Sequence, residues 1–228
     1  MKLLFPLLLC FLFLSACSSE AIPETEPTED QRVNETESNG DQYARTGIQA
    51  YRDRNYEQAE VDFKKALEAT TLSYDRKEIY TLLGNAYNEL EHFDSSIVYH
   101  KKALELDSNY VEAWVHLGIV YRLTAKFDQA ENCYKRAHQI DPNDPELNAS
   151  IGALYVIKGE PQKGISYLEK AIEKNEQLAV AHSNYALALA MVGRYDEADA
   201  ELKRAVALGY SSGDIIKQRI ENLKALDH

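Results

Sequence analysis

The sequence predicts an all-α fold, in which five pairs of helices stack in series and one further helix closes the C-terminal end. The first observation is a series of small residues spaced 34 residues apart: Gly84, Gly118, Gly152 and Ala186. A second series has the same spacing: Ala103, Ala137, Ala171 and Ala205. The third observation is that apolar residues around both series recur at helical spacing. A repeat of 34 residues is long enough for two helices and a turn, so the repeated pattern predicts a stack of helix pairs.

The central copy, Val111–Asp144, shows how each unit is built when Val111 is counted as position 1. One face of its first helix carries a set of large and small residues: Trp114, Leu117, Gly118 and Tyr121. One face of its second helix carries the matching set: Ala130, Tyr134 and Ala137. The small residues mark where the two helix axes come closest, because Gly or Ala lets the backbones approach while the aromatic rings fill the flanks.

This pattern resembles the tetratricopeptide repeat, whose signature is W-x2-L-G-x2-Y, then A-x3-F, Ala and Pro over 34 residues. The resemblance implies a right-handed α-solenoid in which the first helices line the concave side. Five copies are in register: 40–73, 77–110, 111–144, 145–178 and 179–212. The sequence therefore predicts a solenoid over 41–212, followed by a capping helix within 213–228.

The connections between helices carry three further expectations. Gly159 and Gly193 occupy position 15, where a left-handed residue would end each first helix. Three residues are inserted around Thr70–Arg76, and Ser73 is expected to cap a first helix lengthened by about one turn. In the capping helix, Ile216, Ile220 and Leu223 continue the apolar face, as the last helix of a solenoid requires.

Residues 1–16 are interpreted as a secretory signal peptide, because their apolar run is shorter than the roughly 20 residues of a transmembrane helix. Leu14-Ser15-Ala16-Cys17 resembles the bacterial lipobox, which implies cleavage before Cys17 and attachment of lipid to its thiol. An ordinary signal peptide with a chance Cys is the alternative. Ser18 favours the outer membrane, facing the periplasm, if the organism has two membranes. Residues 17–40 then form the lipidated Cys and an acidic disordered tether.

The composition excludes several classes of function. The formal net charge is −12, which argues against nucleic-acid binding and against a basic patch that binds a membrane surface. Lipid would therefore be reached only through Cys17. The histidines form no metal-binding pair, and Asp141–Asp144 lacks the spacing of a calcium loop. We therefore expect no enzymatic activity, no metal and no cofactor. His100 is expected to be a satisfied interior residue, and Cys133 a small apolar filler of the core.

Function must then come from a surface, and the first helices offer one. Positions 2, 5, 9, 12 and 13 lie opposite the face that packs on the second helix. We select from them the following partner-binding residues: Tyr51, Asn85, Asn88, Ile119, Arg122, Val156, Leu187 and Met191. The resulting groove is polar near its start and apolar near its end. The alternative is that these residues pack against neighbouring helices or simply face solvent.

The combination of repeats with a lipobox resembles bacterial envelope lipoproteins that help to assemble pilus secretins or dock cell-wall hydrolases. It predicts a non-catalytic adaptor that is tethered to the cell-envelope membrane and binds a protein or peptide segment in its concave groove. The alternative is a structural homo-oligomer that pairs through its apolar C-terminal groove. Some members of this family bind acidic C-termini through a basic clamp that contains Lys and Asn. This chain has Ala44 and Ile48 at those positions, so binding of chaperone tails is not expected.

Overall fold

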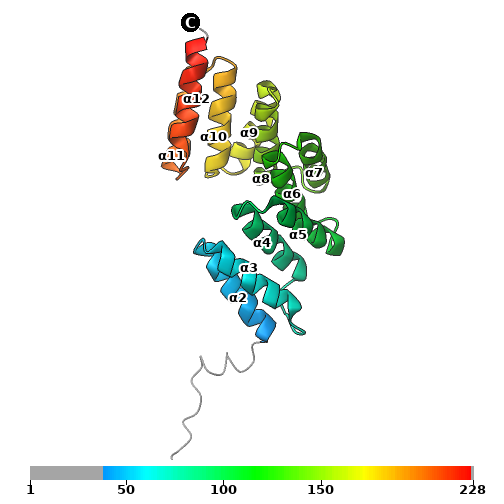
Figure 1. Ribbon diagram of the computed structural model, residues 1–228. Coiled ribbons are helices and arrows are strands. Elements are labelled where there is room, and N and C mark those ends of the chain that lie inside the picture. Colours follow the sequence, from blue (N-terminus) through cyan, green and yellow to red (C-terminus); the bar gives the residue numbers. More distant parts are fainter. Residues whose placement is uncertain (1–37, 227–228) are drawn as a thin grey trace, which may run out of the picture. The chain divides into compact units, whose positions relative to one another are not determined.

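Eleven helices and no strands form residues 38–226, the part of the chain that the computed structural model describes (Figure 1). The helices are α2 (Asn39–Arg52), α3 (Tyr56–Glu68), α4 (Arg76–Glu89), α5 (Phe93–Leu106), α6 (Val111–Leu123), α7 (Phe127–Ile140), α8 (Pro145–Ile157), α9 (Pro161–Lys174), α10 (Ala179–Met191), α11 (Tyr195–Ala207) and α12 (Gly213–Leu226). The predicted signal peptide, Cys17 and nearly all of the predicted tether lie outside the described residues.

The first ten of these helices form five antiparallel pairs, from α2 with α3 to α10 with α11, and α12 packs on α10 and α11. The predicted fold class, five helix pairs and a cap, is confirmed. Close approach within a pair follows the repeat pattern. A Cβ atom on Gly47 would lie 2.7 Å from the ring of Phe63, and one on Gly84 would lie 2.7 Å from the ring of His100. In the first four pairs, position 8 of the first helix thus meets position 24 of the second helix.

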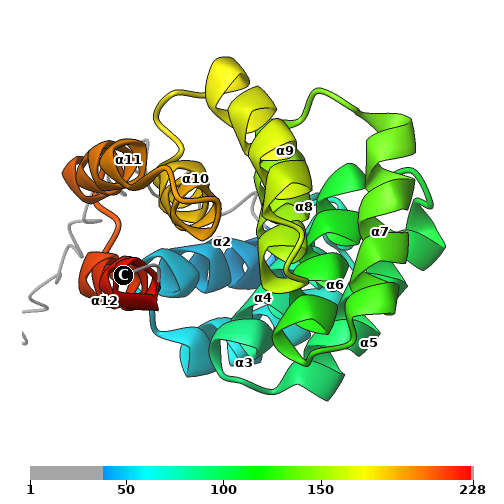
Figure 2. The same ribbon diagram turned by 90° about the horizontal axis from the view of Figure 1, so that it is seen from above.

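The first helices line the inner side of the stack. Each contacts the next one along the series, from α2 with α4 to α10 with α12, whereas successive second helices make no such contacts among the described residues. Helices that stay close together lie on the inside of a curved stack, and helices that splay apart lie on the outside. Figure 2 shows α5, α7, α9 and α11 outside the first helices. The inner face therefore belongs to α2, α4, α6, α8, α10 and α12.

In each pair, the residue at position 15, which lies between the first and the second helix, has a left-handed backbone conformation. The predicted Gly159 and Gly193 have φ of 75° and 79°, so this expectation is confirmed. The first three repeats place Arg54, Glu91 and Ala125 at the same position, with φ of 59°, 58° and 56°. These three residues adopt a conformation that costs a residue with a Cβ about 1–2 kcal/mol. The turn geometry is set by the helix pair, and the residue present has to adopt it.

The expectation of a lengthened helix after the insertion is wrong. Helix α4 begins at Arg76, and its N-cap is Asp75, whose side chain accepts from the backbone N–H of Lys77 at 2.9 Å. Ser73 is tied back to α2 instead. Its backbone N–H donates to Oδ1 of Asp41 at 2.6 Å, and its hydroxyl donates to Oδ2 at 2.9 Å. The inserted residues form a connection that binds the start of the first helix pair.

The cap and Cys133 behave as the sequence predicts. Ile220 of α12 is fully buried and Ile216 nearly so, with Leu223 packed beside them, so the apolar face of α12 covers the last pair. Cys133 is buried in the central apolar cluster, and this burial raises its pKa to about 12. A thiol held protonated among apolar side chains is a filler of the core.

Candidate functional site

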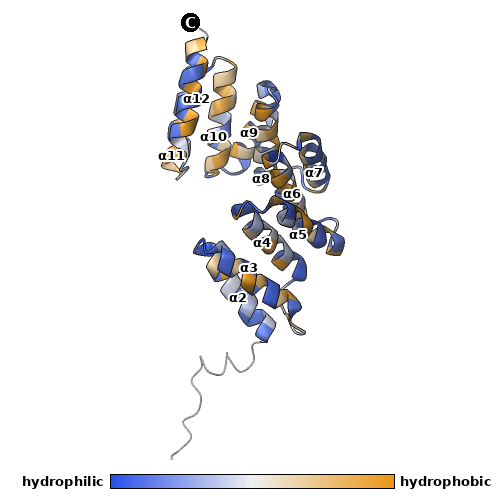
Figure 3. Ribbon diagram, in the orientation of Figure 1, coloured by the Kyte–Doolittle hydropathy of each residue, from blue (hydrophilic) through white to orange (hydrophobic). Residues whose placement is uncertain are grey.

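Three of the predicted partner-binding residues, Val156, Leu187 and Met191, line a single hollow of about 620 Å³. The hollow, called the apolar groove below, lies between α8, α10 and α12. Its wall consists mainly of aliphatic side chains: Val156, Ile157, Leu187, Met191, Arg219, Asn222, Leu223 and Leu226. Three consecutive first helices thus contribute to one open apolar surface. Figure 3 shows the contrast along the stack, since α10 is coloured mainly toward hydrophobic and α2 is not.

The groove has a buried floor and an exposed rim. Val156 is only 4% exposed and belongs to the floor, where it also packs between helices. Ile157 and Leu226 are 49% and 82% exposed, and both line the groove. Large aliphatic side chains that gather at one hollow are unusual on a soluble surface and mark a binding site more often than isolated exposed residues do. The sequence analysis missed Leu226, because the cap was expected only to close the stack.

The polar residues that were predicted for the same surface do not gather in a comparable hollow. Asn85 is 9% exposed, and its amide nitrogen lies 3.4 Å from Nε2 of His116 on α6. Oδ1 of Asn88 and Nε of Arg122 are buried without a hydrogen-bond partner among the described residues. Ile119 is half-buried against the central cluster. The interior therefore takes up part of the polar stripe that the sequence placed on the inner face.

Tyr51 lies at the start of the inner face and is half-buried. Its ring meets the ring of Tyr56 edge to face at a centroid distance of 5.4 Å. Burial, with the nearby charge of Glu89, raises the pKa of Tyr51 to about 12. Tyr51 is thus part of the packing between α2 and the start of α3, and it is distant in sequence from the three helices that form the apolar groove.

His100 differs from the expectation of a satisfied interior residue. It is fully buried, but neither ring nitrogen has a hydrogen-bond partner among the described residues. Its ring stacks on that of His116 with centroids 5.7 Å apart. Burial, together with His116, lowers the pKa of His100 to about 3. The reason is its register, because position 24 packs the ring against Gly84, which has no side chain to bond it.

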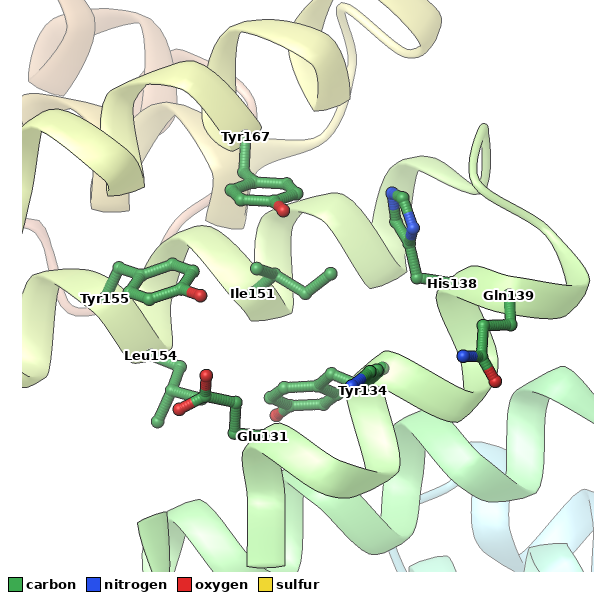
Figure 4. A pocket seen from close by; sticks show the side chains of 9 residues that line it. Glu131, Tyr134, His138, Gln139, Ile151, Leu154, Tyr155 and Tyr167 are labelled. Atoms are coloured by element: carbon green, nitrogen blue, oxygen red, sulfur yellow. The ribbon is translucent and has the colours of Figure 1, made fainter. Parts of the chain in front are cut away.

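A second hollow, on the outer side, was not predicted. It measures about 360 Å³ and lies between α7, α8 and α9, with Tyr134, His138, Tyr155 and Tyr167 around it (Figure 4). The rings of Tyr155 and Tyr167 are stacked with centroids 5.9 Å apart, and His138 meets Tyr167 edge-on at 6.1 Å. One signal could have revealed it: His138 stands at position 28, where the other repeats have aliphatic residues, namely Leu67, Leu104, Ile172 and Val206.

Neither hollow carries a recognisable catalytic arrangement. Among residues 38–226, no group of three or more His, Cys, Asp or Glu side chains is placed to hold a metal ion. Within the same range, no helix is long and apolar enough to cross a membrane. The apolar groove is lined by aliphatic groups with one guanidinium and one carboxamide, which can bind but offer no nucleophile or general base.

Comparison with known proteins agrees with the repeat pattern. Family models of the tetratricopeptide repeat match residues 111–144, and also 77–110 and 145–177. The chain contains tetratricopeptide repeats. These matches cover the three middle helix pairs, and the geometry described above extends the same unit to the first and last pairs. Tetratricopeptide repeats generally mediate protein–protein interaction. A search of curated proteins finds no match.

Solved structures share the fold at low sequence identity. A thermophilic tetratricopeptide-repeat protein of Thermus thermophilus is 21% identical, with a TM-score of 0.67 over 82% of this chain and 99% of that chain. MamA of Desulfovibrio magneticus is 18% identical, with a TM-score of 0.58 over 76% and 96%. Another MamA structure is 23% identical, with a TM-score of 0.56 over 77% and 94%. At these identities the likeness establishes the fold alone.

Proposed function

We propose that this tetratricopeptide-repeat chain is a non-catalytic adaptor that binds a segment of a partner protein on its inner face. The observation that carries the proposal is the apolar groove, where Leu187, Met191 and Leu226 form an open aliphatic surface. Burying such a surface releases about 25 cal/mol per Å², so a groove of this kind favours an apolar partner. An amphipathic helix or an extended segment laid along the first helices is the binding mode that suits it.

The proposal also places the adaptor at the bacterial cell envelope, held by lipid on Cys17. Its support is the short apolar run of residues 1–16, which ends in Leu14-Ser15-Ala16-Cys17, and the acidic stretch that follows it. Stable membrane attachment takes more than one acyl chain. Fatty-acid labelling and detergent-phase partitioning of Cys17→Ser would decide this part, because a variant that still labels contradicts it. Ser18 favours the outer membrane, provided that the organism has one.

The decisive experiment for the groove is crosslinked capture from cell envelopes with the full chain and two groove variants. Leu187→Glu and Met191→Asp place a charge at half-buried positions of the groove, whereas Val156→Asp would place one on its buried floor, where the helices pack together. We expect at least a tenfold loss of binding, about 1.4 kcal/mol, for each variant that keeps its helical circular dichroism.

Two charge reversals on the outer side provide the controls. Lys101→Glu changes an exposed residue of α5 that lines neither hollow and should leave capture unchanged. Lys135→Glu changes the rim of the outer hollow. If Lys135→Glu abolishes capture while the groove variants bind normally, the partner uses the outer face and the proposal is wrong.

The homo-oligomer is the second candidate, and the exposure of Ile157 and Leu226 at the groove favours it, since a second copy could cover them. Light scattering separates the two candidates. A monomer favours the adaptor. A dimer that Met191→Asp converts to a monomer would show instead that the groove pairs with itself.

A further inference from the structure

The hollow on the outer side, between α7, α8 and α9, has no part in the function proposed above. Figure 4 shows Tyr155, Tyr167 and His138 on three sides of it, with Ile151 between them. Ile151 and Leu154, which also line the hollow, are 7% and 1% exposed. The hollow, called the aromatic hollow below, therefore has walls of aromatic rings and a buried aliphatic floor.

In the second repeat, three aromatic rings pack together where the fourth repeat has two. Tyr99 at position 23 contacts Tyr80 at position 4, with centroids 6.1 Å apart, and Tyr87 at position 11, with centroids 5.4 Å apart. In the fourth repeat, Tyr167 at position 23 stacks on Tyr155 at position 11, with centroids 5.9 Å apart. The third ring, at position 4, is missing from this repeat.

Position 4 of the fourth repeat is Asn148. The first three repeats have an aromatic residue there: Tyr43, Tyr80 and Trp114. Asn148 turns back toward the connection before its own helix, since its Nδ2 donates to the backbone carbonyls of Pro142 at 3.1 Å and Asp144 at 2.8 Å. It therefore supplies no ring to Tyr167, which meets only the edge of His138 apart from its stack with Tyr155.

We propose that the aromatic hollow is a second binding site of this chain, which takes one aromatic side chain of a partner protein. The inserted ring packs on Tyr167 above Ile151 and supplies the third ring that the second repeat takes from Tyr80. Aromatic rings gain from such stacked or edge-to-face contacts, and buried aromatic anchors dominate many protein interfaces. The site is separate from the apolar groove, so the chain can hold two partners at once.

The surroundings of the hollow disfavour two other kinds of ligand. Lys158 and Lys163 lie over the ring of Tyr155, at 5.9 and 5.4 Å from its centroid, and Lys170 lies 5.4 Å from that of Tyr167. A cationic side chain would therefore meet like charges around the rings. The aliphatic floor offers no hydrogen-bond partner to the hydroxyls of a sugar. A neutral aromatic ring fits both the walls and the floor.

The test is selection of a random dodecapeptide phage library on the full chain in detergent micelles. Peptides that bind the parent chain but not Tyr167→Ala are kept, and we expect them to share one Trp, Tyr or Phe. In synthetic peptides, replacing that residue by Ala should weaken binding at least tenfold, measured by fluorescence anisotropy. Tyr99→Ala is the matched control, because it removes the ring at position 23 of the second repeat and should leave the affinity unchanged.

Two further variants close the hollow itself. Asn148→Tyr gives the fourth repeat the position 4 ring of the second and should weaken binding of the same peptides at least tenfold. Lys135→Trp places a ring on the exposed rim and should have the same effect, so it carries the test if a change at the buried Asn148 lowers the melting temperature. Met191→Asp, in the apolar groove, should leave these peptides bound as before.

The outcomes separate this site from the apolar groove. If no selected peptide depends on Tyr167, or if the dependent peptides share no aromatic residue, the second site is ruled out while the adaptor proposal stands. Peptides that bind Lys135→Trp as tightly as the parent chain, or that Tyr99→Ala weakens equally, would also overturn it. Loss of the same peptides on Met191→Asp would assign them to the apolar groove and contradict a separate site.

Discussion

The two halves of the inner face use the same repeat positions in different ways. At positions 9 and 12, the first helices α4 and α6 carry Asn85, Asn88, Ile119 and Arg122. The interior takes up part of that polarity, because Asn85 contacts His116. At the same positions, α8 and α10 carry mostly aliphatic residues that leave an open hollow.

The comparison teaches that a polar residue on a first helix does not by itself mark a binding surface. Asn85 is drawn inward by the stacked pair of His100 and His116, whereas Met191 and Leu226 line a hollow that the cap leaves open. The N-terminal half has an apolar core too, but it also contains a polar cluster that is incompletely bonded. The C-terminal half is held by apolar packing and retains an open groove. Four experiments test this contrast.

The largest effect is expected at the close contacts between paired helices, which both halves share. Ala130→Leu in the third repeat and Ala198→Leu in the fifth should each lower the free energy of unfolding by about 1–3 kcal/mol, because both alanines are fully buried at a close helix contact. The neighbouring changes Glu131→Ala and Asp199→Ala remove part-exposed ion pairs and should cost less than about 1 kcal/mol. Urea denaturation measures both. Equal losses at neighbouring positions would mean that the register is wrong.

The second effect is a pH dependence of stability that is specific to the N-terminal half. The pKa of His100 is about 3 in the folded chain and roughly 6.5 when unfolded, so the unfolded state binds more protons between these values. Stability is therefore full above about pH 6.5 and falls as the pH drops, by about 2 kcal/mol at pH 5. His100→Leu should remove this loss, since Leu168 and Leu202 fill the same position in later repeats.

Denaturation of the parent chain and of His100→Leu at pH 7 and pH 5 checks this prediction. The variant should also be more stable at pH 7, by about 1–3 kcal/mol, because two unpartnered ring nitrogens leave the core. His100→Phe serves as a second variant, chosen because Phe63 fills this position in the first repeat. If both variants lose stability with acid as the parent chain does, His100 is not the group that titrates.

A smaller effect concerns position 15, which has the same geometry in both halves but different residues. Gly159→Ala should cost about 1 kcal/mol, because a Cβ there meets open space and only the left-handed backbone opposes it. Ala125→Gly should gain up to about 1 kcal/mol, less the extra entropy of an unfolded glycine. Paired thermal melts measure the difference. Opposite signs would contradict the role given to this turn.

The smallest effect is expected for partner binding by the polar half. Asn85→Ala removes a contact with His116 and should lower stability by about 1 kcal/mol, but it should change capture of the partner less than about twofold. The matched change in the other half is Leu187→Ala at the same repeat position, which shortens a groove side chain and should weaken capture more. If Asn85→Ala weakens capture as much as Leu187→Ala does, the polar stripe contacts the partner as well.

The sequence by itself determined the fold, because a 34-residue spacing of small and aromatic residues can be satisfied only by helix pairs that meet at those positions. It also determined the left-handed turns at Gly159 and Gly193 and the apolar face of the cap, since these depend on local conformation and helical period. It further identified Val156, Leu187 and Met191 as neighbours on one face.

Only the tertiary structure decided which of those faces stays open. Ser73 was expected to cap a helix, but Asp41 on another helix binds it, and a contact across 32 residues leaves no local pattern. The sequence did not reveal that Asn85 and His100 both contact His116 on a third helix, α6. It also did not show that Arg219 and Leu226 line the same groove as Val156 and Leu187. Periodicity fixes which side of a helix a residue occupies, whereas the exposure of that side depends on how closely the neighbouring helices pack.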